Sequence, residues 1–266
     1  MEDEVNMHVA DTLGIAPYGL PPEDGPSIFR AGRRLSRTGF FVLETLVHGT
    51  LANDGRRDER EKAEHLAWVA ENLCALHGIQ VVQHGSLPSV PAIYVANHVS
   101  YVEPIAILSK VRATAIAKRE IGDWPMIGDA AKALGVLLVD RSCPASGASV
   151  LFEAWRRLTE GVSLVVFPEG TTTRGDEVLP FRRGVFGLSK LSGHPIVPIA
   201  VRYDTDEVAW VGDDPFLPHY VRTTRRNRTR VHLHFGEPID PACHDGEAHH
   251  FAALSRSVIE RMLALA

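Results

Sequence analysis

A histidine and an acidic residue stand five positions apart, directly after the apolar run 92–96. They are His98 and Glu103. A carboxylate bound to one nitrogen of an imidazole fixes the tautomer of the ring and stabilises the imidazolium, so this pair can serve as a general base. The same two residues also fit a purely structural role, and by themselves they leave both interpretations open.

Pro104 indicates where the helix after this pair begins. Proline is tolerated in the first turn of a helix, so the spacing predicts a start between Tyr101 and Pro104. Ser100-x-x-Glu103 also fits a capping box. That motif would place Pro104 at the fourth helical position, where an N–H is needed, and we disfavour it. His98 is therefore expected just outside the helix, with Glu103 at its start.

A second polar segment, residues 167–175, follows another apolar run. Glycine, three threonines and an arginine there offer backbone and side-chain donors that suit a phosphate, and Glu169 can accept a hydrogen bond from a hydroxyl. The alternative is a polar turn with an incidental arginine. Cations also stand at the ends of other predicted strands or at the start of a helix, namely at Lys118-Arg119, Arg141 and Arg182-Arg183.

These segments are expected to lie on an α/β scaffold. Short β-type runs alternate with helical patterns, which predicts a mixed, mostly parallel central sheet flanked by helices on both faces. In such a sheet ligands bind at the carboxyl ends of the strands, where both polar segments emerge. The predicted strands are 79–82, 92–96, 114–117, 136–139, 164–167, 196–203 and 231–235, and the predicted helices are 28–47, 58–77, 104–110, 126–134, 146–160, 184–192 and 248–265.

Residues 28–47 form an amphipathic pattern. At 100° per residue, Ile28, Leu35, Val42 and Leu46 fall on one stripe, and four arginines cluster opposite, namely Arg30, Arg33, Arg34 and Arg37. A basic amphipathic helix suits the headgroup layer of an anionic membrane, and it also suits a helix packed on the domain with a solvated arginine face. A second basic stretch, which contains no acid, comprises Arg222, Arg225, Arg226, Arg228 and Arg230. It predicts either a surface patch that contacts anionic lipid or an acidic carrier protein, or a solvated loop.

The composition narrows the class of protein. The 266 residues carry a net charge of −5, which argues against nucleic-acid binding. Cys74, Cys143 and Cys243 give no disulfide framework and no CxxC pair, which favours a reducing cytoplasm. No apolar run is long enough to span a bilayer, and the start lacks the pattern of a secretory signal. His232 and His234 share a strand face, but no third ligand stands at a useful spacing, so we predict a surface pair and no metal site.

Taken in order, these segments resemble the glycerolipid acyltransferases, whose best-known members are the 1-acylglycerol-3-phosphate acyltransferases. The resemblance is carried by four ordered blocks and spans residues 79–240. The blocks are His98-x4-Glu103, Gly135…Val139-Asp140-Arg141, Phe167-Pro168-Glu169-Gly170-Thr171 and Val197-Pro198-Ile199-Ala200-Val201. Four blocks in register are a specific signal.

The resemblance implies direct acyl transfer. His98 is expected to deprotonate a hydroxyl of a lysophospholipid, which attacks the thioester of acyl-CoA or an acyl-carrier protein, while Glu103 orients the ring. Neither an acyl-enzyme nor a cofactor beyond this co-substrate is implied, and Gly-x-Ser-x-Gly is absent. The alternatives are a catalytically weak lipid-binding protein of the same fold and an acyl-thioester hydrolase. Substrate binding is expected at Arg141, Glu169, Gly170, Thr171, Arg174 and Lys118.

Composition and the resemblance together predict an organisation along the chain. Residues 1–27 are expected to be a loose acidic arm, 28–77 an N-terminal helical segment at a membrane interface, and 78–266 the acyltransferase domain. The acyl chains of the substrates favour the membrane interpretation of the helix 28–47. We therefore expect a cytoplasmic protein, peripheral on the inner face of the cell membrane, with no nucleic-acid partner.

Two positions depart from the family pattern. The family usually has aspartate where Glu103 stands, and a displaced carboxylate can reduce the rate, so we predict that Glu103→Asp is tolerated or improves activity. Members that use a phosphomonoester acceptor often have arginine where Thr172 stands. The threonine resembles members that act on lysophospholipids with a larger headgroup, because a monoester carries more charge and benefits more from arginine.

Overall fold

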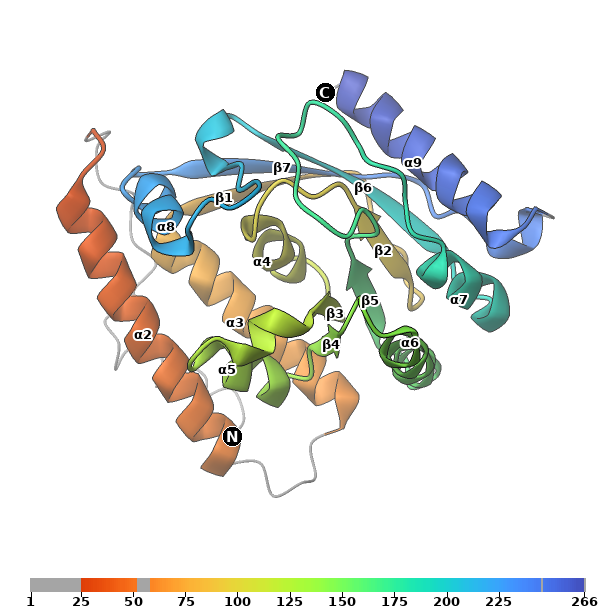
Figure 1. Ribbon diagram of the computed structural model, residues 1–266, viewed down its shortest axis with the longest axis horizontal. Coiled ribbons are helices and arrows are strands. Elements are labelled where there is room, and N and C mark those ends of the chain that lie inside the picture. Colours follow the sequence, from red (N-terminus) through yellow and green to blue (C-terminus); the bar gives the residue numbers. More distant parts are fainter. Residues whose placement is uncertain (1–24, 52–57, 245, 266) are drawn as a thin grey trace.

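The computed structural model describes residues 25–51, 58–244 and 246–265, so residues 1–24 of the predicted acidic arm lie outside the described residues. One seven-stranded sheet crosses the molecule in the order β1-β7-β6-β2-β5-β3-β4 (Figure 1). Neighbouring strands pair in parallel except β6 and β7, which are antiparallel. The strands are β1 (Ile79–His84), β2 (Ile93–Ala96), β3 (Ala113–Lys118), β4 (Leu137–Val139), β5 (Ser163–Val166), β6 (Ile196–Tyr203) and β7 (Thr229–Phe235).

Helices cover both faces of this sheet, because successive side chains of a strand point to opposite faces. On β2, Tyr94 and Ala96 join the core built with α3 (Glu59–His77) and α4 (Val102–Leu108). Ile93 and Val95 join the core built with α6 (Pro144–Thr159), α7 (Gly184–Ser192) and α9 (Ala248–Leu265). The prediction of a mixed, mostly parallel sheet flanked by helices is confirmed.

The predicted elements are all present, with ends shifted by a few residues, and among the described residues one α-helix and three short 3-10 helices were not predicted. That α-helix is α8 (Phe216–Thr224), whose third residue, Pro218, is compatible with a first turn but obscures the helical pattern. The alternative of a solvated loop for the basic stretch is wrong, because α8 contains Arg222, β7 contains Arg230, and acids from other segments pair with the stretch. Arg226 lies 3.0 Å from Glu207, and Arg222 lies 2.6 Å from Asp214.

The first described helix, α2 (Ile28–Leu51), packs on α3, α5 (Ile127–Ala133) and α8 (Figure 1). The prediction of four arginines on one solvated face is wrong for two of them. Arg30 donates to the carbonyl of Arg225 at 2.8 Å, and the buried Arg34 donates to the carbonyls of Thr224, Arg226 and Asn227 at 2.8, 2.6 and 2.9 Å. The last carbonyls of a helix have no partner inside it and carry partial negative charge, so an inward arginine stabilises the end of α8.

The outward face of α2 is apolar. Ile28, Phe29, Phe40 and Leu43 are 62%, 87%, 70% and 49% exposed, while Phe41 is buried. This face is rotated from the predicted stripe because the inward arginines fix the opposite side. Arg33 and Arg37 are exposed beside it. Within the described residues, no helix combines the length and apolarity needed to cross a bilayer.

Candidate active site

The predicted acid–base pair is assembled at the carboxyl end of β2. His98 Nδ1 lies 2.8 Å from Glu103 Oε2. The Glu103 side chain has no exposed area, whereas that of His98 is 18% exposed. Helix α4 begins at Val102, inside the interval that Pro104 predicts, so His98 stands just before the helix and Glu103 in its first turn.

Glu103 is held by three further donors. Its Oε2 accepts from the backbone N–H groups of Ser100 at 2.8 Å and Val99 at 3.2 Å, and its Oε1 accepts from the Tyr203 hydroxyl at 2.5 Å. Burial and the adjacent carboxylate raise the pKa of Tyr203 well above its usual value, so the phenol keeps the proton it donates. The contact with Ser100 does not make a capping box, because the N-cap residue of α4 is Tyr101 and Glu103 is the second residue of the helix. Pro104 is then the third residue, inside the first turn.

Two further side chains fix the histidine loop, and the sequence did not identify either of them. The ring of Phe167 stacks on that of His98 with centroids 4.3 Å apart. Asn97 donates to the Val201 carbonyl at 3.0 Å and accepts from its N–H at 2.8 Å, which ties the end of β2 to β6. Asn97 precedes the first block and Phe167 begins the third, but the spacing of the blocks does not indicate which residues these two contact.

The second polar segment lies against the first, as predicted. Glu169 is buried, and its two oxygens accept from the backbone N–H groups of His98 at 2.7 Å and Leu179 at 2.8 Å. The N–H of Thr173 donates to the His98 carbonyl at 2.8 Å. Burial raises the pKa of Glu169 above its usual value despite these donors. Glu169 therefore positions the His98 backbone in this structure.

Two guanidinium groups flank the turn at Gly170. Arg141 donates to the Gly170 carbonyl, and Arg182 lies so close that a Cβ at Gly170 would be 2.7 Å from its Nε. Gly170 has a φ of 78°, which glycine adopts without strain. Burial, followed by the charge of Arg182, lowers the pKa of Arg141. Two cations beside exposed Thr171 make this turn suited to an anionic group.

Lys118 lies near the same region, beside the ring of Trp210. Its Nζ lies 5.9 Å from the ring centroid of Trp210. The backbone N–H of Trp210 donates to the Val99 carbonyl at 2.9 Å, and the Thr172 hydroxyl donates to the backbone carbonyl of Trp210. Trp210 therefore links both loops of the site, and the sequence did not indicate this role.

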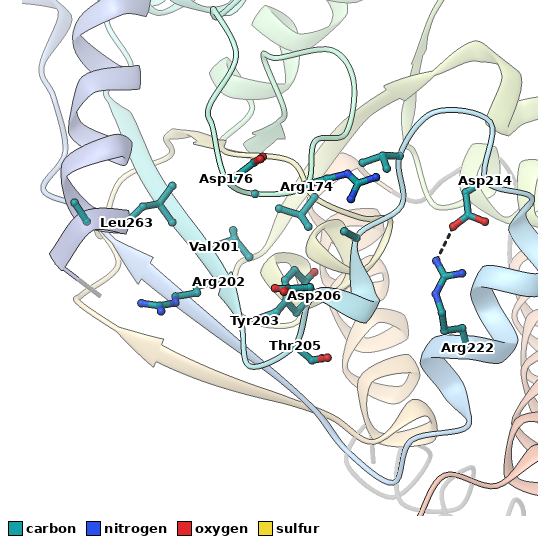
Figure 2. A pocket seen from close by; sticks show the side chains of 15 residues that line it. Arg174, Asp176, Val201, Arg202, Tyr203, Thr205, Asp206, Asp214, Arg222 and Leu263 are labelled. Atoms are coloured by element: carbon teal, nitrogen blue, oxygen red, sulfur yellow. Dashed lines mark hydrogen bonds and ion pairs between the residues drawn. The ribbon is translucent and has the colours of Figure 1, made fainter.

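Arg174 lies apart from the Gly170 turn, at a cavity of about 1000 Å³. Figure 2 shows Arg174 and Asp176 on one segment and Val201 and Tyr203 on β6, and all four line this cavity. His98 does not line it, although its neighbour Val99 and the Glu103 partner Tyr203 do. The wall carries charges of both signs, including the ion pair of Arg222 and Asp214 at 2.6 Å.

Comparison with known proteins identifies the family. Residues 75–202 match the family model described as Acyltransferase. The lyso-ornithine lipid O-acyltransferase of Pseudomonas aeruginosa is 34% identical over 181 residues, which cover 65% of this chain and 68% of that protein. A protein of the same name from Rhodobacter capsulatus is 30% identical over 244 residues, which cover 83% and 86%. This chain belongs to the glycerolipid acyltransferase family, and it is an acyltransferase.

A solved structure shows the same fold. The crystal structure of the 1-acyl-sn-glycerophosphate acyltransferase from Thermotoga maritima matches this chain with a TM-score of 0.67 at 21% identity. The match covers 89% of this chain and 94% of that one, so the sheet and its flanking helices are those of this enzyme fold.

Proposed function

We propose that this enzyme transfers a fatty acyl group from the thioester of acyl-CoA or an acyl-carrier protein to a hydroxyl of a lysolipid, with His98 as general base. The observation that carries this proposal is the 2.8 Å contact between His98 Nδ1 and the buried Glu103. Because Nδ1 faces Glu103, Nε2 is the ring nitrogen left for the acceptor hydroxyl, and the His98 side chain is 18% exposed. The relatives named for lyso-ornithine lipid support a lysolipid acceptor.

The reaction moves one proton from the acceptor hydroxyl to His98 and then from His98 to the leaving thiolate. Nε2 of His98 takes the proton of the acceptor hydroxyl as its oxygen bonds to the thioester carbonyl carbon, and Glu103 stabilises the imidazolium. The tetrahedral intermediate then collapses, the carbon–sulfur bond breaks, and the proton passes from Nε2 to the departing thiolate. The products are an ester and a free thiol, and no covalent enzyme intermediate is required.

The anionic part of the acceptor is proposed to bind at the Gly170 turn, between Arg141 and Arg182. Thr172 stands where an arginine would suit a phosphomonoester, and its hydroxyl already donates to Trp210. The nearby cavity presents Arg174 beside Asp176, a pair of opposite charges. We propose a zwitterionic headgroup, a class that includes the ornithine headgroup in the names of the two relatives, since ornithine carries an amine and a carboxylate.

We also propose that the enzyme is peripheral on the cytoplasmic face of the cell membrane. The support is the outward face of α2, where Phe29 and Phe40 are largely exposed and Arg33 and Arg37 lie alongside. Apolar side chains that enter the acyl boundary act together with cations that attract anionic headgroups. Such a surface would bring the active site to its lipid substrates.

The test combines the purified chain with labelled acyl-CoA or acyl-carrier protein and a panel of lyso-ornithine lipid, 1-acylglycerol-3-phosphate and lysophosphatidylethanolamine. We expect a diacyl product, formed fastest with a zwitterionic acceptor. Release of free fatty acid without an acceptor would instead identify a thioester hydrolase. Retention of lipid with neither product would identify a binding protein.

His98→Ala should abolish transfer, by a factor of about 100 or more, because general base catalysis contributes about 10² to 10⁴. His249→Ala is the control, since His249 is exposed on α9. The labelled diacyl product is measured for both variants after circular dichroism shows that they are folded. Retention of more than a few per cent of the activity by His98→Ala would exclude this residue as the base.

A further inference from the structure

Three histidines meet on the sheet face opposite α3 and α4. His232 and His234 alternate along β7 with the buried Val231 and Leu233. The parallel pairing of β1 with β7 sets His84 directly opposite His234. Within the part of the chain that the structure describes, these three side chains offer ligand nitrogens within 4.8 Å of one another. The missing third ligand that led us to predict a surface pair is therefore supplied by a strand 148 residues away from His232.

This cluster is separate from the catalytic pair. Residues directly opposite each other in paired strands point to the same face of a sheet. The β6 partner of His232 is Arg202, whereas the next residue, Tyr203, points to the other face and binds Glu103. The sheet itself lies between the two sites, and no histidine of the cluster touches the acyl-transfer machinery.

The contacts of His232 define which of its two ring nitrogens has a free lone pair. Its Nε2 lies 3.0 Å from Asp204 Oδ1, so the proton on Nε2 is held by a carboxylate. Its Nδ1 then carries the lone pair and faces His84 Nε2 at 3.4 Å. Arg230 holds the second oxygen of Asp204 at 3.1 Å. A carboxylate that accepts from the outer nitrogen of a histidine is the usual support of a metal-binding imidazole.

We propose that His84, His232 and His234 bind a divalent transition-metal ion of the zinc class, with Asp204 orienting His232. Imidazole nitrogens suit zinc, nickel and copper, and three protein ligands plus water complete a tetrahedral site. Zinc–nitrogen distances of about 2.0–2.1 Å require ligand nitrogens about 3.3 Å apart. The rings of His84 and His234 now stack with centroids 4.2 Å apart, so rotation of these open side chains completes the geometry.

The cluster is accessible from solvent. His84 is exposed, so an ion can reach the cluster from solvent.

The proposed ion would stabilise the edge of the sheet. β1 lies at one end of the strand order and pairs only with β7 among the described strands. One ligand from β1 and two from β7 would cross-link these strands. A ligand that binds the folded state alone stabilises it, so zinc should raise the midpoint of thermal unfolding.

The test is a titration of the tag-free full chain with Co²⁺, in which the visible absorption of the bound Co²⁺ is measured. Zn²⁺ is then added to displace the Co²⁺, and its affinity is measured in competition with a chelating indicator. We expect one equivalent of metal ion to bind per chain. His84→Ala should weaken binding at least tenfold, and Asp204→Asn about tenfold, which is the usual effect of removing such a support. The unfolding midpoint should rise with Zn²⁺ in the wild type and not in His84→Ala.

Matched controls come from the adjacent pair His249 and His250, whose ring centroids lie 3.9 Å apart on α9. His249→Ala and His250→Ala should bind Co²⁺ as the wild type does. Absence of a one-equivalent Co²⁺ signal in the wild type, or equal affinity in His84→Ala, would overturn the proposal. Should His84→Ala not fold, His84→Gln provides the same comparison, and no readout depends on acyl transfer.

Discussion

At the scale of single residues, Glu103 has more partners than the orientation of a base requires. One carboxylate, with no exposed area, accepts from the His98 ring, two backbone N–H groups and the Tyr203 hydroxyl. A buried carboxylate needs such donors to offset its lost hydration. The same side chain thus forms the acid–base pair and closes the turn before α4.

These contacts reverse our expectation for Glu103→Asp. The shorter side chain withdraws the carboxylate by more than an ångström, so it cannot reach the His98 ring and the Tyr203 hydroxyl together. Misplacement of a catalytic group on that scale costs about a hundredfold, and we now expect kcat/KM to fall by about that factor. Steady-state kinetics measures it, with Tyr203→Phe as the comparison that removes one donor and keeps the shape. Wild-type activity in Glu103→Asp would show that the loop adjusts to the family's aspartate.

At the scale of elements, α2 is attached to the domain through its arginines. Arg34 is buried against the end of α8, and burial lowers its pKa to about 10, so it stays cationic at neutral pH. Its guanidinium satisfies three carbonyls that no helix hydrogen bond reaches. The helix that would meet the membrane is therefore held by groups that we first assigned to solvent.

Arg34→Gln should lower the free energy of unfolding by about 2–3 kcal/mol, because hydrogen bonds from a charged group contribute about 1.5–3 kcal/mol and their loss leaves carbonyls unpaired. Urea denaturation measures this quantity. Arg33→Gln, on the exposed side of the same helix turn, should change it by less than about 0.5 kcal/mol. Equal effects of both substitutions would contradict the capping role of Arg34.

His77 joins three helices and should make stability depend on pH. Its Nε2 contacts the hydroxyls of Tyr220 on α8 and Thr38 on α2, and its Nδ1 contacts the Leu73 carbonyl at 2.8 Å. Burial lowers the pKa of His77 from 6.5 to about 4. The unfolded chain therefore binds a proton below pH 6.5 that the folded chain takes up only near pH 4, so stability falls as the pH drops through this window.

The expected slope is at most about 1.4 kcal/mol per pH unit for this one group. Denaturation of the wild type and His77→Gln between pH 6.5 and 4 measures it. The variant is less stable at neutral pH but should lose less stability on acidification. Parallel curves for the two proteins would show that His77 does not titrate in this way.

At the scale of the whole molecule, one group of exposed apolar side chains lies on α2 and on the two helices α5 and α8 that pack against it. Besides Phe29 and Phe40, Met126 and Ile127 are 37% exposed at the start of the neighbouring α5. Helix α8 contributes Leu217, which is 54% exposed. The helices α5 and α8 both pack on α2, so these side chains belong to one region of the molecule.

Binding to vesicles should separate the two components of this surface. Phe29→Ser with Phe40→Ser should weaken co-sedimentation with neutral and anionic vesicles alike, because apolar burial is lost. Arg33→Gln with Arg37→Gln should weaken it with anionic vesicles only, because the attraction is electrostatic. Arg30 and Arg34 are left intact, since they hold the helix. Unchanged co-sedimentation in both double variants would remove the membrane role of α2.

Local patterns in the sequence determined the elements and the order of the chemical segments. Strand and helix periodicities, the stop at Gly78 and the restriction imposed by Pro104 each act within a few residues, so they can be found without a structure. The mostly parallel sheet then follows from the alternation of elements, and it places His98 and Glu169 together at the carboxyl ends of its strands. The acid–base pair itself spans only five residues, which is why its spacing was informative.

The tertiary structure decided which distant groups meet. Tyr203 binds Glu103 from 100 residues away, His84 reaches His232 from 148 away, and Arg34 finds its carbonyls from 190 away. Such contacts depend on strand order, on register and on which side of a helix turns inward. Those features are set by how the whole core closes, because each surface is buried against whatever the rest of the chain presents, and no local pattern records the partner.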